Sequence, residues 1–145
     1  MSCILIVESP YYKAVSDELL LGAKKELEKN HVQCKHLIVS GALEIPQAVL
    51  LAINSKMKFD GVVALGCVIR GETSHYDIVS TESARALMNL AMDYNIPIGN
   101  AILTVDSMDQ AKIRSDHKGY NKGGNAVRAC LNLINLKVTL WAKET

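Results

Sequence analysis

The feature that most constrains the fold is an alternation between short apolar runs and longer stretches of helical periodicity. The apolar runs, each of a length suited to a strand, are residues 3–7, 36–39, 61–68 and 98–105. Short, largely apolar runs are typical of strands buried on both faces of a parallel sheet. Strands and helices in alternation predict an α/β fold, in which a mostly parallel four-stranded sheet lies between helices in a doubly wound, three-layer α/β/α sandwich.

Helical segments are predicted between and after these strands. Apolar residues that recur at helical spacing mark the buried faces of three of them. These faces are Val15, Leu19, Gly22, Ala23 and Leu27 in the first helix, Val79, Ser83, Ala86, Leu87, Leu90 and Ala91 in a helix that begins near Ser74, and Ala126, Ala129, Cys130, Leu133 and Ile134 in the last, which follows a glycine-rich loop over residues 118–124. Two further helices are predicted over 44–55, with Pro46 in the first turn, and over 108–114, capped by Ser107.

Composition narrows the class of protein. The 145 residues, 49% of them hydrophobic, suit one domain over residues 1–145 with a sizeable core. The net charge of +1 and the absence of a basic face argue against nucleic acid as a partner. The four cysteines lie far apart and show no metal-ligand spacing, and no run reaches membrane-spanning length. We therefore predict a cytoplasmic protein with no metal and no membrane partner.

In doubly wound sheets, ligands bind beyond the carboxyl ends of the strands. After the first strand, Tyr11 and Tyr12 could stack on a flat ring or simply cover the end of the helix, and spacing alone favours the second. After the second strand, Gly41 permits a close backbone approach. Glu44 there could accept hydrogen bonds from a polyol or could only complement the helix dipole, and the sequence leaves both interpretations open.

Polar residues are densest after the third strand, from Arg70 to Asp77. The predicted helix start near Ser74 offers backbone N–H groups suited to a phosphate. His75 would lie in its first turn, where an imidazole could exchange protons near neutral pH or could be merely exposed.

The fourth strand contains Asn100, and it is followed by Arg114, Lys118 and Lys122. The guanidinium could bind a phosphate through two parallel hydrogen bonds, although single surface lysines are usually only solvated. The glycine-rich stretches fit neither the dinucleotide-binding nor the P-loop pattern. These residues together predict a polar pocket for a small phosphorylated ligand, and they argue against a flavodoxin-like electron carrier.

At these same segments the chain resembles the lumazine synthase family, over nearly its whole length. The motifs that carry the resemblance are Gly41-Ala-Leu-Glu-Ile-Pro46, Ala64-Leu-Gly-Cys-Val-Ile-Arg-Gly-Glu-Thr-Ser-His-Tyr-Asp77, Asn100-Ala-Ile-Leu-Thr104, Asp109-Gln-Ala111 with Arg114, and Asn121-Lys-Gly123. The resemblance implies a flavodoxin-like fold and a transferase of riboflavin biosynthesis that needs no cofactor. Such an enzyme condenses 5-amino-6-(D-ribitylamino)uracil with 3,4-dihydroxy-2-butanone 4-phosphate to give 6,7-dimethyl-8-ribityllumazine, phosphate and water.

For the ribitylaminouracil, the resemblance implies three groups of binding residues. Tyr11 would stack on the uracil ring, at a position where the family often has phenylalanine. Ala42, Leu43 and Glu44 match the segment that binds the ribityl chain, with Leu43 where an aromatic residue is common. Cys67, Val68 and Ile69 match the strand end that binds the pyrimidine edge through backbone groups.

For the butanone phosphate, the resemblance implies a turn at Glu72 and Thr73 and an arginine, Arg114, that binds the phosphate. An acidic Glu72 departs from the small residue common there, so we expect its backbone N–H to make the contact, with the carboxylate turned away. His75 matches the residue that transfers protons, and Lys122 is a further candidate near the phosphate. His75 and Arg114 are thus the expected catalytic residues.

The family's active sites lie between adjacent subunits of a ring of five, and some members assemble pentamers into a shell. Asn100 falls where many members have an aromatic residue from the neighbouring subunit, and it could instead hydrogen-bond the heterocycle or ribityl group. Because the chain starts almost directly at its first strand, we expect an isolated homopentamer. The alternatives are a non-catalytic relative that binds a flavin or lumazine, and an assembly scaffold.

Overall fold

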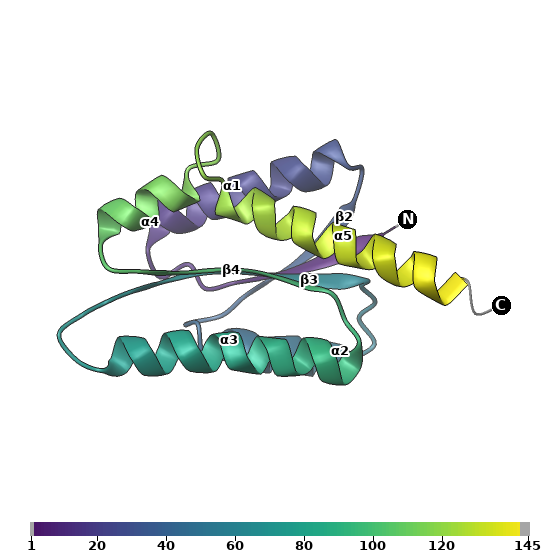
Figure 1. Ribbon diagram of the computed structural model, residues 1–145, viewed down its shortest axis with the longest axis horizontal. Coiled ribbons are helices and arrows are strands. Elements are labelled where there is room, and N and C mark those ends of the chain that lie inside the picture. The colour runs from purple at the N-terminus through teal and green to yellow at the C-terminus, as the bar shows by residue number, and fades with distance from the viewer. Residues whose placement is uncertain (1, 143–145) are drawn as a thin grey trace.

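A computed structural model describes residues 2–142 of the chain, which form a four-stranded, wholly parallel sheet between two layers of helices (Figure 1). The strands are β1 (Cys3–Glu8), β2 (Gln33–Ile38), β3 (Gly61–Ile69) and β4 (Ile98–Val105), in the order β2-β1-β3-β4. The predicted α/β class, the three layers and the parallel sheet are confirmed. The predicted domain over residues 1–145 includes residue 1 and residues 143–145, which lie outside the described residues.

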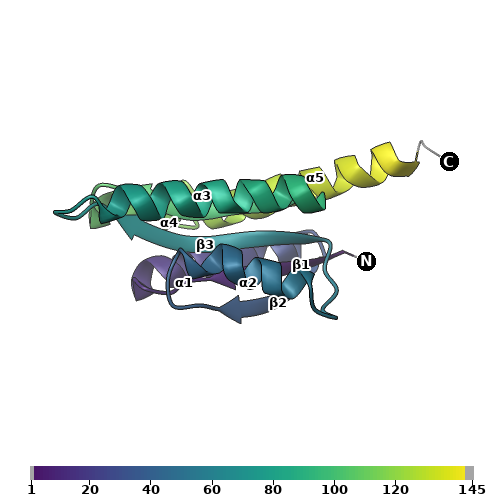
Figure 2. The same ribbon diagram turned by 90° about the horizontal axis from the view of Figure 1, so that it is seen from below.

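Helices cover both faces of the sheet. They are α1 (Lys13–Lys29), α2 (Glu44–Ile53), α3 (His75–Tyr94), α4 (Met108–Ser115) and α5 (Lys122–Ala142). Figure 1 shows α1, α4 and α5 above the sheet and α2 and α3 below it, and the last turns of α5 extend past the end of the sheet (Figures 1 and 2). Over residues 2–142, no helix combines the length and apolar character needed to cross a membrane.

Two apolar clusters fill the spaces on either side of the sheet, because side chains alternate between its faces. In β1, Ile4 and Ile6 face α1 and α5, whereas Leu5 and Val7 face α2 and α3. All four are completely buried, which explains the continuous apolar run at the start of the sequence.

The second strand begins three residues earlier than predicted, at Gln33 instead of His36. It is an edge strand, and Gln33, Cys34 and Lys35 pair with β1 through their backbones while their side chains stay exposed. Backbone pairing of this kind leaves no apolar signal in the sequence, which is why the strand was predicted too short.

The last helix begins at Lys122, inside the segment predicted as a loop. Its glycines pack against α1, and a Cβ on Gly123 would lie 2.2 Å from the carbonyl oxygen of Leu19. Its buried face also differs from the prediction, since Ala129 and Leu133 are exposed and Val127 is buried. The short helix α4 is capped as predicted, because the Ser107 Oγ accepts a hydrogen bond of 3.2 Å from the Gln110 amide.

Candidate active site

A pocket of about 300 Å³ lies at the carboxyl ends of β1 and β3. At this point the chain order of the sheet reverses, since β1 leads toward β2 on one side and β3 leads toward β4 on the other. Ligands of doubly wound sheets bind in the crevice outside such a reversal. The lining comes from Ser9, Tyr11 and Tyr12, the segment 40–44, the segment 67–69, and His75 and Val79 of α3.

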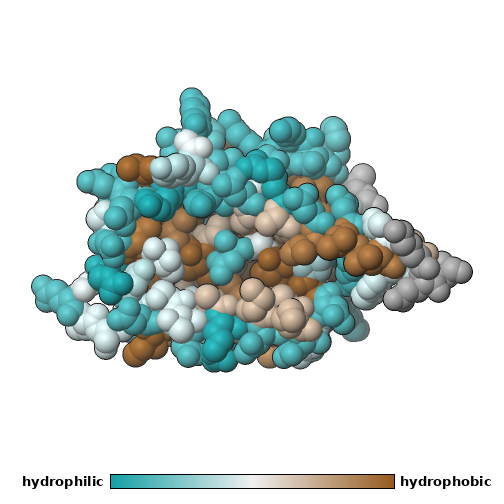
Figure 3. Space-filling model, in the orientation of Figure 1, coloured by the Kyte–Doolittle hydropathy of each residue, from teal (hydrophilic) through white to brown (hydrophobic). Residues whose placement is uncertain are grey.

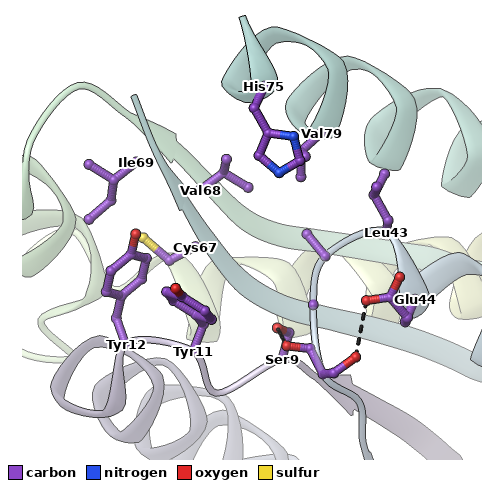
Figure 4. A pocket seen from close by; sticks show the side chains of 13 residues that line it. Ser9, Tyr11, Tyr12, Leu43, Glu44, Cys67, Val68, Ile69, His75 and Val79 are labelled. Atoms are coloured by element: carbon purple, nitrogen blue, oxygen red, sulfur yellow. Dashed lines mark hydrogen bonds between the residues drawn. The ribbon is translucent and has the colours of Figure 1, made fainter. Parts of the chain in front are cut away.

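Two tyrosines form one wall of the pocket (Figure 4). The rings of Tyr11 and Tyr12 meet edge to face, with their centroids 4.9 Å apart. Tyr12 is half-buried and its pKa is raised, chiefly by burial and also by the nearby Cys67 thiol. Tyr11 is 74% exposed, so a face of its ring is open to a flat ligand.

The turn between β2 and α2 presents a carboxylate to the pocket. Glu44 lies in the first turn of α2, and its Oε1 accepts a hydrogen bond of 3.1 Å from the Ser40 hydroxyl. The Ser9 hydroxyl in turn donates a hydrogen bond of 3.3 Å to the Ser40 carbonyl. A Cβ on Gly41 would lie 2.8 Å from Glu44 Oε1, so a side chain at that position would displace the carboxylate. The arrangement fixes an acceptor suited to hydroxyl groups of a ligand.

The end of β3 leaves backbone groups open toward the pocket. The pairing of β3 with β1 stops at Leu65, whereas its pairing with β4 continues to Ile69. On the β1 side, residues 67–69 therefore have no strand partner within the described chain, and the backbone N–H and C=O groups that point to that side are open toward the pocket. Cys67 is 8% exposed, and burial raises the pKa of its thiol to about 11, so this thiol stays protonated at neutral pH.

His75 is the first residue of α3, and its ring projects toward the cavity opposite the tyrosines (Figure 4). The Thr73 hydroxyl accepts a hydrogen bond of 3.3 Å from the His75 amide, at a helix start whose backbone N–H groups suit an anion. Glu72 and Thr73 themselves are exposed and do not line the pocket.

Three further predicted site residues lie away from this pocket. Asn100 faces a separate hollow of about 430 Å³ between α3 and β4, and its Oδ1 accepts a hydrogen bond of 2.8 Å from the Ile102 amide. Arg114 donates a hydrogen bond of 3.2 Å to the Gln110 carbonyl on α4, and Lys122 is exposed at the start of α5. Neither cation lines the pocket of its own chain.

The pocket also includes residues outside the predicted set, among them Ser9, Ser40 and Val79. Their positions carry a signal in retrospect. Ser9 directly follows the first strand, and Val79 lies one helical turn after His75, on the same face of α3.

Away from the pocket, ligand atoms of Glu18, Asp116 and His117 lie within 4.8 Å of one another. The His117 Nδ1 is 3.1 Å from Glu18 Oε1, and the Lys118 amide donates a hydrogen bond to Asp116. These protein contacts account for the cluster without a metal ion.

A solved structure of a lipoprotein fragment from Peptoclostridium difficile 630 resembles this fold, with a TM-score of 0.51 over 90% of this chain and 95% of that one. Only 11% of the aligned residues are identical, so the similarity concerns the fold alone.

Sequence comparison is more specific. The family model for 6,7-dimethyl-8-ribityllumazine synthase matches residues 2–138. Proteins of that name from Agrobacterium fabrum and Methylorubrum populi are 50% and 48% identical to this chain. The alignments cover 94% of this chain and 95% of the first relative, and 92% of this chain and 82% of the second. The chain therefore belongs to the 6,7-dimethyl-8-ribityllumazine synthase family.

Proposed function

We propose that this chain is the transferase of riboflavin biosynthesis that condenses 5-amino-6-(D-ribitylamino)uracil with 3,4-dihydroxy-2-butanone 4-phosphate. Family membership supports the reaction. The observation that carries the proposal is the pocket at the chain reversal, where an exposed tyrosine ring, a fixed carboxylate and His75 surround one cavity. An aromatic ring, a polyol acceptor and a proton carrier are the groups that this condensation requires.

The ribitylaminouracil would lie against Tyr11, with its pyrimidine edge on the open backbone of Cys67, Val68 and Ile69. Its ribityl hydroxyls would extend toward Ala42, Leu43 and Glu44. The Ser40 hydroxyl bonded to Glu44 supports this placement, because it orients the carboxylate before a ligand arrives. Placing the 5-amino group near the second substrate would supply much of the rate, since positioning replaces an encounter in solution.

The butanone phosphate would bind with its phosphate at the start of α3, near Glu72 and Thr73, with Arg114 and Lys122 supplying positive charge. The amine attacks the ketone, and loss of water gives an imine. Removal of a proton from the adjacent carbon then expels phosphate. The enol left by this elimination tautomerises to a ketone, and the second amine closes the ring onto that carbonyl with loss of another water. His75 would move protons in the imine and elimination steps, and Arg114 would stabilise the departing phosphate.

We further propose that the chain acts in the cytoplasm as a homopentamer, with each active site between adjacent subunits. The placement of Asn100, Arg114 and Lys122 supports shared sites, because none of these residues lines the pocket of its own chain. A neighbouring subunit would bring them to the pocket. In this arrangement Asn100 would hydrogen-bond the heterocycle or ribityl group from the adjacent chain.

The absorbance change of lumazine formation tests the proposal. We expect the wild-type protein to exceed the uncatalysed condensation, which must be subtracted. His75→Ala should lower kcat by about 10²–10⁴-fold at most, the range for a general acid–base group. Arg114→Ala should chiefly raise the KM for the butanone phosphate. Native mass and sedimentation of the same samples would measure the assembly.

Binding measurements separate the enzyme from a non-catalytic flavin or lumazine binder. A wild-type protein no faster than the background, yet able to bind lumazine tightly, would contradict the synthase function. Lys24→Ala is a suitable control, because Lys24 is exposed on α1 and does not line the pocket. It should leave both kinetic constants unchanged.

A further inference from the structure

The connection between β3 and α3 has little packing to fix its shape. Residues 71–74 are all exposed, and a Cβ added to Gly71 would have no heavy atom within 4 Å. This connection nevertheless leads directly into His75 and forms the start of α3, where the phosphate is proposed to bind. Something other than apolar burial must therefore hold its two ends.

Arg70, at the beginning of the connection, contacts three side chains from the neighbouring elements. Its Nε donates a hydrogen bond of 2.9 Å to Oδ1 of Asp106, the residue directly after β4. Its Nη1 donates one of 3.4 Å to Asp77 Oδ1 in the first turn of α3. The guanidinium carbon also lies 4.2 Å from the centre of the Tyr76 ring. One side chain thus joins the end of β3, the start of α3 and the β4–α4 turn.

The β4–α4 turn is itself connected to Arg114. The Asp106 amide donates a hydrogen bond of 2.7 Å to Gln110 Oε1, and the Gln110 carbonyl accepts one of 3.2 Å from Arg114 Nη1. Arg70 is therefore linked through hydrogen bonds both to the first turn of α3, where His75 lies, and to α4, which carries Arg114.

We propose that Arg70 is a positioning residue that fixes the β3–α3 connection and the first turn of α3 for phosphate binding, through Asp106 and Asp77. Its Nε and Nη1 donate to carboxylates and Tyr76 lies over one face of the guanidinium, so the role assigned to Arg70 is to hold these segments together and not to bind the phosphate directly. This inference rests on the proposed function, since it assigns a role within the same site. Arg70 is not among the residues predicted for the site.

Direct phosphate binding by Arg70 makes the opposite prediction for Asp106. If Asp106 only competes for the guanidinium, then its removal should free Arg70 and lower the KM for the butanone phosphate. If Asp106 anchors Arg70, then its removal should raise that KM. The sign of the Asp106 effect therefore separates positioning from direct contact.

A double-mutant cycle tests the inference on the assembled protein. We expect Arg70→Met and Asp106→Ala each to raise the KM for the butanone phosphate by about three- to fivefold, the scale of an exposed ion pair. The double variant should be no worse than Arg70→Met alone, because both changes break one interaction. The KM for ribitylaminouracil should stay unchanged. Asp106→Asn, which keeps an acceptor oxygen, should retain most of the wild-type affinity and guards against misfolding of the alanine variant.

Arg85→Met is the matched control, because Arg85 forms an exposed ion pair with Glu82 on the same helix. The same chemical change there should leave the KM values unaltered. Additive effects in the cycle, or a KM that falls in Asp106→Ala, would overturn the positioning role while leaving the synthase function intact. Equal changes in both KM values would also overturn it, because they would indicate a general structural defect.

Binding of inorganic phosphate gives a readout that is independent of turnover. Titration calorimetry should give a dissociation constant that rises by the same three- to fivefold in Arg70→Met and Asp106→Ala, again without additivity. If the wild type binds phosphate in this manner but shows no synthase activity, then the proposed function fails and the positioning role stands. A wild type that binds no phosphate would overturn the positioning role.

Discussion

The face of the sheet under α1 and α5 is packed so closely that it requires glycine, whereas the face under α2 and α3 leaves part of β4 uncovered. On the first face, a Cβ on Gly99 would lie 2.1 Å from the carbonyl oxygen of Ala126 in α5. On the second face, Asn100 and Thr104 of β4 are exposed beside a hollow of about 430 Å³. One face is thus completed within the chain, and the other is not.

Exposed apolar side chains accompany the open side. Figure 3 shows apolar atoms in a band across the middle of the view that has β4 between α5 and α3 (Figures 1 and 3). Large exposed residues on α3 and on the last turns of α5 include Ile78, Met88, Met92, Leu136 and Trp141. Extended apolar surface on a small domain marks an interaction site. The contrast teaches that the closed face stabilises the single chain, while the open side is available for the neighbouring subunit of the proposed pentamer.

The largest expected effect is the loss of stability when one methyl group is added to the closed face, compared with the same addition on the open face. Gly99→Ala should destabilise the protein by about 3 kcal/mol, because the backbone of α5 cannot move aside without disrupting the packed core. Gly66→Ala is the matched change on the open face, where a Cβ would meet Ile45 and Ile102 at the ordinary contact distances of 3.4 and 3.6 Å. Thermal and denaturant unfolding of both variants would measure the difference.

Equal losses of stability in the two variants would contradict this contrast between the faces. A soluble, native-like Gly99→Ala protein would show in particular that α5 can shift away from β4.

The next effect concerns the open side and the proposed shared sites. His75→Ala and Arg114→Ala chains should each be impaired alone. Co-expressed in equal amounts, they should regain about one quarter of the wild-type activity, because a random ring pairs an intact His75 with a neighbour's intact Arg114 at about that frequency. Steady-state rates of the mixed rings would measure the recovery.

Separately purified rings that are mixed without exchange of subunits serve as the control for this experiment. If the co-expressed rings show only the average activity of the two single variants, then His75 and Arg114 belong to the site of one chain. That result would contradict the view that the open side completes its site with a neighbouring subunit.

The sequence predicted the elements that lie inside the molecule better than those at its edges. The buried β3 and the apolar face of α3 follow from side-chain periodicity, because burial selects the side chains there. The start of β2 depends on backbone pairing with Cys3, and the start of α5 depends on the close approach of Gly123 to α1. Such contacts between distant segments have no local pattern.

The candidate site divides in the same way. The strand-end rule predicted the region that holds Tyr11, Glu44 and His75, and the structure brings these residues to one pocket. Asn100 lies in the last strand, and Arg114 and Lys122 come after it in sequence, yet none of the three lines this pocket. A rule for one sheet contains no information about a second chain, so their assignment rests on the family resemblance and stays a prediction.

The smallest expected effect is a difference in alkylation rate between two buried thiols. It tests how far the closely packed face shields its side chains from a reagent. Burial raises the pKa of Cys67 to about 11 and that of Cys130 to about 12. A raised thiol pKa means less reactive thiolate, so at pH 8 Cys67 should react roughly 100-fold more slowly than a thiol with the ordinary pKa of 9.0, and its rate should rise with pH up to about 11. Mass spectrometry of timed iodoacetamide reactions would measure both sites, with the exposed Cys34 as the internal reference.

Access should separate the two thiols further than their pKa values do. Cys67 borders the pocket, whereas Cys130 lies on the buried face of α5 and is completely buried, with its Sγ 3.6 Å from the Pro97 carbonyl. Cys67 should therefore be labelled in the native protein and protected by ribitylaminouracil, while Cys130 should be labelled only as α5 unfolds. If Cys130 is labelled as fast as Cys67, then the closed face opens in the native state. If ribitylaminouracil does not protect Cys67, then the heterocycle does not bind in this pocket.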